Sequence, residues 1–130
     1  MVANATVPGL TNLPASLSPD AIDGLLRHDL GFGGLVLTDS LSAGAITHAG
    51  YDLPHAATSA IGAGADMILF GSTLTPAETE LLTPANVDRS VNEIVATIVT
   101  AVASGALPES RLDSAAGHVL TAKGIDLCAR

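Results

Sequence analysis

The side chain best placed for chemistry is a carboxylate that follows an unbroken apolar run. Residues 35–38 read Leu-Val-Leu-Thr, and Asp39 and Ser40 come next. We expect the run to form a strand covered on both faces, with Asp39 at its carboxyl end. Function collects at this end of parallel α/β strands, because the rigid sheet holds loops that are free to vary. An ionised carboxylate there can act as a nucleophile. Asp39 could equally cap the turn that follows, and the pattern alone names no reaction.

The elements that must position Asp39 alternate along the chain as strands and helices. Ser18, Pro19 and Asp20 form a typical helix start, and Gly31 is a stop. Most connections are too long for hairpins, so we expect parallel strands joined by crossover helices, an α/β fold. The predicted strands are residues 1–7, 35–38 and 65–70, the predicted helices are 18–30, 52–64, 87–104 and 111–123, and residues 40–51 form a loop with at most one helical turn.

The strongest helical pattern lies between residues 87 and 104. Apolar side chains recur there at spacings of three and four residues, which is typical of a helix that buries one face. These side chains are Val91, Ile94, Val95, Ile98, Val99 and Val102. Gly105 and Pro108 end the pattern.

The composition indicates one folded domain and argues against several partners. The 130 residues are 48% hydrophobic and 2% aromatic, so we expect one domain, residues 1–130, with a core of Ala, Val, Leu and Ile. The net charge of −8, with no basic stripe, argues against nucleic acid and anionic membranes as partners. Cys128 is the one cysteine, so neither an intramolecular disulfide nor a cysteine-based zinc site is expected. We predict no metal and no cofactor.

No targeting segment is recognisable in the sequence. Residues 1–8 lack the basic and apolar regions of a secretory signal, and no apolar run approaches the roughly 18 residues of a membrane span. As given, the chain is expected in the cytoplasm, and its location is otherwise unassigned.

Three blocks of sequence, in order along the chain, resemble one enzyme family. Residues 13–18 read Leu-Pro-Ala-Ser-Leu-Ser, residues 34–42 read Gly-Leu-Val-Leu-Thr-Asp-Ser-Leu-Ser, and residues 63–67 read Ala-Gly-Ala-Asp-Met. The sequence and separation of these blocks resemble glycoside hydrolase family 3, and within it the β-N-acetylhexosaminidase branch.

The resemblance implies a fold and a role for Asp39. The fold is a (β/α)8 barrel of the TIM type, and this chain resembles only the C-terminal part of it. That part holds three parallel strands, barrel strands 6 to 8, with flanking helices. By its place in the Thr-Asp block, Asp39 would be the nucleophile of a retaining glycosidase. A completed barrel would take an N-acetylglucosaminide-type carbohydrate, and members of the family can be secreted or lipid-anchored.

The resemblance also implies that part of the catalytic machinery lies elsewhere. In this branch the leaving-group acid is a His-Asp pair on a mobile loop, upstream of the segment that this chain resembles. None of the four histidines, His28, His48, His55 and His118, stands in that loop's Lys-His-Phe-Pro-Gly-His context. We therefore assign the role to none of them, and expect little or no turnover from the isolated chain.

Three side chains are candidates for lining the mouth of the barrel: Asn4, Ser40 and His48. A simple buried amide is an equal alternative for Asn4. His48 and His55 both follow Asp39 in the chain, although a histidine on a surface loop is the commoner case.

Other polar residues are predicted to be structural or solvated. His28 and His118 are expected on solvated helix faces. Asp66 opens the strand at residues 65–70, at the end opposite to Asp39, and recurring residues at that end serve stability.

Two other functions stay open. The chain could be a non-catalytic interaction module, because three parallel strands leave two unpaired edges that favour self-association or a complementary barrel fragment. A phosphate-binding barrel enzyme is a weaker alternative, suggested by the glycine-rich residues 62–72.

Overall fold

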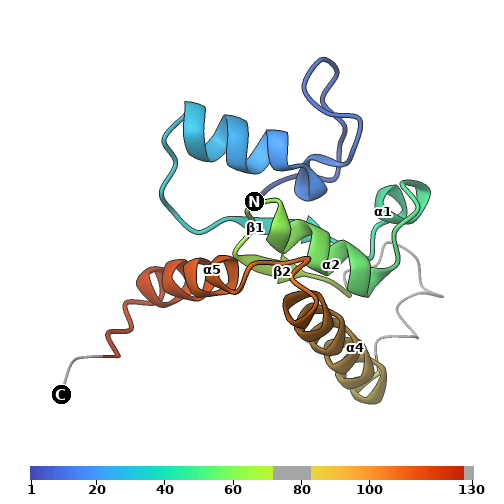
Figure 1. Cartoon of the computed structure of the whole chain (residues 1–130). Coiled ribbons are helices and arrows are strands. Elements are labelled where there is room, and N and C mark those ends of the chain that lie inside the picture. Colours follow the sequence, from blue (N-terminus) through green and yellow to red (C-terminus); the bar gives the residue numbers. More distant parts are fainter. Residues whose placement is uncertain (72–82, 128–130) are drawn as a thin grey trace.

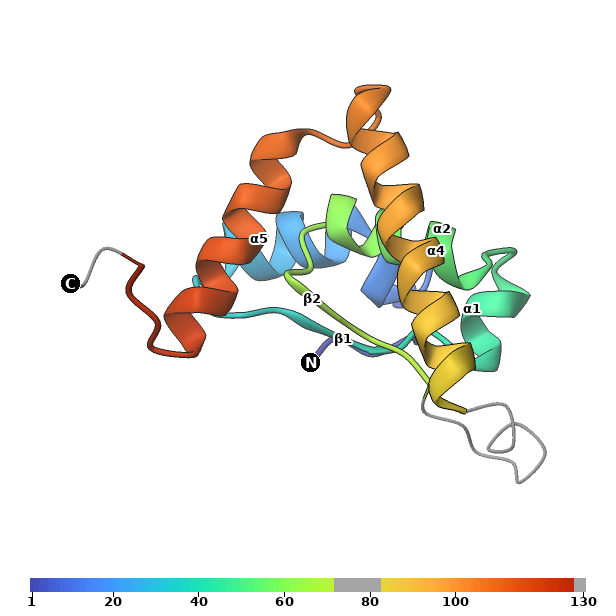
Figure 2. The same ribbon diagram turned by 90° about the horizontal axis from the view of Figure 1, so that it is seen from below.

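The computed structural model describes residues 1–71 and 83–127, so Ser72 and Cys128 lie outside the described residues. Among these residues, helical segments pack around two short strands and leave one face of the strand pair uncovered (Figure 1 and Figure 2). The α/β class is confirmed. In chain order the elements are the 3-10 helix η1 (Ala15–Leu17), the π-helix η2 (Asp20–Asp29), β1 (Leu37–Ser40), α1 (Gly44–His48), α2 (Leu53–Gly62), β2 (Met67–Leu69), α4 (Pro84–Ala103) and α5 (Glu109–Ala122).

The sheet is smaller than the sequence predicted. β1 and β2 pair in parallel, as expected for strands joined by a crossover helix, and Figure 2 shows them side by side. The third parallel partner is a single bridge between Val2 and Thr38. The Val2 N–H donates to the Leu37 carbonyl, and the Val2 carbonyl accepts from the Asp39 N–H, both at 2.8 Å.

The strand predicted over residues 1–7 is therefore wrong beyond its second residue. The carbonyls of Ala3 and Ala5 accept hydrogen bonds from the N–H groups of Ser16 and Ala15, at 3.1 and 2.9 Å. These partners belong to the segment around η1 and not to the sheet. The apolar, β-branched pattern of the N-terminus cannot reveal this pairing, because it depends on a loop farther along the chain.

β1 begins two residues later than predicted, so Asp39 lies inside the strand and not after it. The Val36 N–H is bound by the side chain of Asp66 at 2.9 Å. Residue-to-residue pairing with β2 begins only at Leu37, opposite Met67.

Local signals account for the start of α2 and α4. The Asp52 carboxylate and the Thr83 hydroxyl each accept a backbone N–H of the first turn, at 2.9 and 3.3 Å, and a proline stands in that turn of both helices. The helices predicted at 52–64, 87–104 and 111–123 are confirmed, and α1 is the single short helix within the predicted loop at 40–51. The predicted helix at 18–30 forms η2, with the wider hydrogen bonding of a π-helix.

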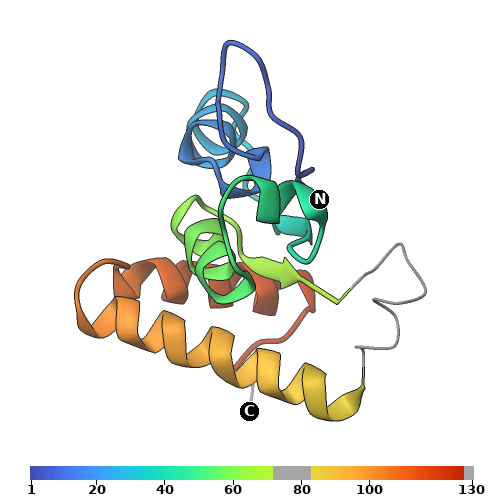
Figure 3. The same cartoon turned by 90° about the vertical axis from the view of Figure 1, so that its right-hand side faces the viewer.

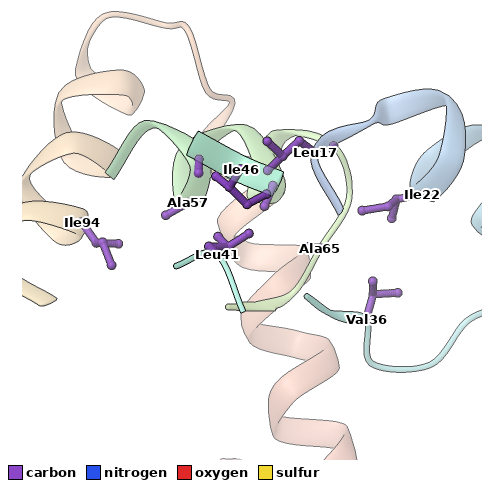
Figure 4. Packing of buried hydrophobic residues seen from close by; sticks show 11 residues of the cluster. Leu17, Ile22, Val36, Leu41, Ile46, Ala57, Ala65 and Ile94 are labelled. Atoms are coloured by element: carbon purple, nitrogen blue, oxygen red, sulfur yellow. The ribbon is translucent and has the colours of Figure 1, made fainter. Parts of the chain in front are cut away.

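α2 lies at the centre of the core. Its residues Ala56, Ala57 and Ala60 are fully buried, and such small side chains allow neighbouring elements to approach closely. In Figure 4, Ile94 of α4 lies on one side of the cluster, and Leu17 and Ile22 of the N-terminal region lie on the other.

The apolar stripe of α4 is only half covered. Ile94 is 7% exposed, whereas Val91, Val95 and Val99 are 42, 53 and 60% exposed. α4 is an outer element that packs against α2 (Figure 3). The pattern predicts a helix that buries one face, and among residues 1–71 and 83–127 only one edge of that face is covered. Within the described ranges no helix has both the length and the apolarity to cross a membrane.

Candidate active site

Asp39 is the third of the four residues of β1, near the carboxyl end of the strand, and is half-buried. Its Oδ1 atom accepts a hydrogen bond from the Ser40 N–H at 2.7 Å. Its own N–H donates to the Val2 carbonyl. The backbone of Asp39 is thus fixed by the N-terminal segment, and one of its two carboxylate oxygens is oriented by the next residue.

Asn4 connects Asp39's end of β1 to the segment that contains η1. Its Nδ2 atom donates to the Ser40 carbonyl at 2.7 Å, and its Oδ1 atom accepts from the hydroxyl of Ser16 at 2.6 Å. Ser16 is fully buried, and Ser40 is only 4% exposed. Both ends of the Asn4 amide are engaged with the protein, which is the arrangement of a structural tie.

Two hydroxyl groups bond to backbone N–H groups across β1 and β2 and the residues that follow these strands. The Thr38 Oγ1 accepts from the Leu69 N–H at 3.1 Å, and the Ser42 Oγ accepts from the Gly71 N–H at 2.9 Å. The sequence does not predict these two bonds or the partners of the Asn4 amide. Hydroxyl residues recur in the blocks at residues 13–18 and 34–42, which indicates that some of them form hydrogen bonds. The partners of those bonds cannot be predicted from the sequence.

His48 and His55, the first two histidines after Asp39, are exposed and bond to their own helices or caps. His48 Nδ1 lies 2.7 Å from the Gly44 carbonyl, four residues earlier in α1. His55 Nδ1 lies 2.7 Å from Asp52 Oδ1. The backbone N–H of His55, and then its ring, lower the pKa of the Asp52 carboxyl. The structure therefore does not bring either ring into hydrogen-bond contact with Asp39.

The prediction that His118 is a solvated surface residue is wrong. His118 is half-buried on α5, and its Nδ1 lies 2.9 Å from Asp66 Oδ1. Arg111, from the same helix, and Arg27, from η2, each bind Asp66 at 2.5 Å. The sequence pattern does not reveal this cluster, because its members are distant in the chain. His28, by contrast, is exposed as predicted and pairs with Asp29.

Burial and bonding act on the Asp66 carboxyl in opposite directions. Burial would raise its pKa, whereas hydrogen bonds from His118, from the Val36 N–H and from the two arginines lower it. The lowering prevails, so the pKa of Asp66 is below its ordinary value and the carboxylate is charged at neutral pH. Asp66 precedes β2, at the end opposite to Asp39, and ties three elements together as the predicted structural role requires.

The described residues form an α/β fold with a parallel strand pair, and in parallel α/β proteins chemistry usually lies at the carboxyl ends of the strands. Among residues 1–71 and 83–127, no group of His, Cys, Asp or Glu side chains is arranged to hold a metal ion. The chain belongs to glycoside hydrolase family 3: the family description "Glycosyl hydrolase family 3 N terminal domain" matches residues 1–122. That domain is an α/β fold of the TIM-barrel type, to which the described part of this chain contributes two strands and the Val2 bridge.

Solved structures of the same family resemble this chain. A family 3 β-N-acetylglucosaminidase from Paenibacillus is 33% identical over 88% of the chain, with a TM-score of 0.71. LpqI from M. tuberculosis is 34% identical over 99%, with a TM-score of 0.72. A family 3 glycosyl hydrolase from Mycobacterium smegmatis is 40% identical over 91%, with a TM-score of 0.67. The chain spans only 19, 35 and 32% of these three proteins, respectively. A comparison with curated proteins gave no match.

Proposed function

We propose that Asp39 is the nucleophile of a retaining glycosidase that acts on N-acetylglucosaminide-type carbohydrates. The observation that carries the proposal is the position of Asp39, half-buried at the carboxyl end of a parallel strand in a family 3 chain. The substrate class is supported by the Paenibacillus relative, which is named a β-N-acetylglucosaminidase.

The geometry at Asp39 suits nucleophilic attack. The Ser40 N–H holds Oδ1, so we assign the attack to Oδ2. Oδ2 would form a bond to the anomeric carbon while the bond to the leaving oxygen breaks, which gives a covalent glycosyl-enzyme. Water would then release the sugar from Asp39. A strand fixed on both sides can hold the attacking oxygen at roughly 3 to 3.5 Å from the anomeric carbon, the distance that reaction requires.

The leaving oxygen needs a proton, and we propose that the acid comes from a part of the barrel outside this chain. His48 and His55 are bonded to their own helices or caps. The chain spans about a fifth to a third of the solved relatives, which leaves room for a second group elsewhere. Without that group, we expect the rate to be lower by a factor of about 10² to 10⁴.

A chimera tests this proposal. The barrel segment that precedes the matching region in the M. smegmatis relative is joined to this chain, and hydrolysis of a nitrophenyl N-acetyl-β-glucosaminide is measured. The chimera should be active, and Asp39→Asn should lower its kcat by at least about 10³-fold, since covalent catalysis is lost. Asp29→Asn, at an exposed carboxylate, is the matched control. Robust hydrolysis by the Asp39→Asn chimera would refute the assignment.

A second candidate function is a non-catalytic module that associates with another chain. It is favoured by the exposure of Val91, Val95 and Val99 along one face of α4. The occupant that we propose is a complementary part of a barrel, with self-association as the alternative. Sedimentation of the chain alone and with such a fragment distinguishes self-association from binding of the fragment. A monomer under both conditions contradicts this candidate.

A further inference from the structure

The pairing of β1 with β2 is interrupted next to Asp39. Leu37 pairs with Met67, and Ser40 pairs with Leu69. Between these two pairs β1 advances by three residues, whereas β2 advances by two. A regular parallel ladder would continue from Leu37 with Asp39 opposite Leu69. β1 therefore carries one extra residue, which is a β-bulge. Bulges are common next to active sites, where they re-aim a side chain.

The hydrogen bonds at this bulge follow from the extra residue. In a regular ladder the Leu69 carbonyl would accept from the Ser40 N–H, but here it accepts from the Leu41 N–H at 2.9 Å. The Ser40 N–H, displaced by one position, donates to Asp39 Oδ1 at 2.7 Å. The bulge thus provides the bond that orients the Asp39 carboxylate.

The side chain of Thr38 sits at the same break. Its hydroxyl accepts from the Leu69 N–H at 3.1 Å, and the residue is fully buried. A valine would have nearly the same shape, but would leave the N–H of the half-buried Leu69 without this acceptor. The choice of threonine here is therefore explained by the hydroxyl and not by packing.

We infer that Thr38 is a positioning residue: its hydroxyl stabilises the bulge in β1, and the bulge directs the carboxylate of Asp39. The inference rests on the proposed function for its consequence in catalysis, since it assumes that Asp39 is the nucleophile. Its structural part, the dependence of the Asp39 geometry on one hydroxyl, holds without substrate.

The structural part is tested in the full chain by NMR. In Thr38→Val, the Leu69 amide should exchange about tenfold faster, because it loses an acceptor, and the carboxyl carbon of Asp39 should shift. Thr38→Ser keeps the hydroxyl and should restore both signals toward the wild type. Thr58→Val is the matched control, because it removes a hydroxyl that bonds the Pro54 carbonyl at 3.0 Å, away from β1. If Thr38→Val leaves Asp39 and Leu69 unchanged, or if Thr58→Val moves them as much, the inference is overturned.

The catalytic part is tested in the chimera. Thr38→Val should lower kcat by up to about 10²-fold with KM nearly unchanged, since a displaced nucleophile slows the chemical step, and Thr38→Ser should recover most of the loss. Equal loss in Thr38→Ser and Thr38→Val would overturn the inference. A chimera with no Asp39-dependent hydrolysis would instead refute the proposed function, while the NMR signals of Asp39 and Leu69 still decide whether Thr38 positions that carboxylate.

Discussion

At the scale of single residues, two carboxylates at opposite ends of the sheet have different surroundings. Asp66 has no exposed side-chain surface and is bound by two arginines and a histidine. Asp39 is half-buried, and one of its oxygens is bonded to the Ser40 N–H. A fully bonded carboxylate joins elements, whereas a partly bonded one at the carboxyl end of a strand is suited to react.

The Asp66 cluster predicts a loss of stability in acid. The pKa of Asp66 is lower in the folded chain than the ordinary value of 3.8. On acidification the Asp66 carboxyl therefore takes up a proton at a higher pH in the unfolded chain than in the folded chain. The stabilisation by Asp66 is complete above that ordinary value, and is lost as the pH falls through the folded-state pKa.

Asp66→Asn should remove this acid-dependent stabilisation. We expect a loss of about 3 kcal/mol in the free energy of unfolding at pH 7, because the substitution leaves two arginines without their buried partner. Urea unfolding between pH 7 and pH 3 measures the effect, with Asp29→Asn as the exposed control. The account of the cluster is wrong if Asp66→Asn keeps the wild-type dependence on pH.

Asn4 and Ser16 should act as one unit. Asn4→Ala leaves the buried Ser16 hydroxyl without its 2.6 Å acceptor, so we expect a cost of about 1 to 3 kcal/mol. Ser16→Ala removes the same bond from the other side. In a double-mutant cycle, the two substitutions together should therefore cost less than the sum of the single ones, by at least about 0.5 kcal/mol. Additive effects, measured by urea unfolding, would contradict the tie.

At the scale of elements, neighbouring positions on α4 should behave very differently. Ile94 is in the core, and Ile94→Ala should cost about 2 to 4 kcal/mol through the cavity that it leaves. Val95 is exposed, so Val95→Ala should change the free energy of unfolding of the chain by less than about 0.5 kcal/mol. Thermal or urea unfolding of both variants is the measurement. Equal losses would show that the outer face of α4 is covered in the chain as it exists in solution.

The elements also show what the sequence could predict. α2 and α4 were predictable because their signals are local: a capping side chain and a proline at the first turn, followed by a helical period. The structure of residues 1–7 was not predictable, because the hydrogen bonds of Ala3 and Ala5 are made with a loop farther along the chain. The same limit applies to the site. Asp39 was nominated by its place after an apolar run, but the bulge beside it depends on β2, which lies about 30 residues later.

At the scale of the whole molecule, the sheet and α4 present surfaces that another chain could cover. Copies of this chain carry a net charge of −8 and repel each other. Salt screens this repulsion, so self-association through the face of Val91, Val95 and Val99 should increase between low and high ionic strength. Val95→Lys should reduce it. Sedimentation at two salt concentrations tests this prediction, and a monomer under all conditions would contradict it.

The central claim is that the carboxylate of Asp39 attacks the sugar, and covalent trapping tests it most directly. A 5-fluoro N-acetylglucosaminyl fluoride has a leaving group that departs without a strong acid, and its glycosyl-enzyme is slow to hydrolyse. Mass spectrometry of the treated chimera, followed by peptide mapping, should find one sugar on Asp39 and none in Asp39→Asn. A label on another carboxylate, a label that survives Asp39→Asn, or no label at all in the active chimera would contradict the account.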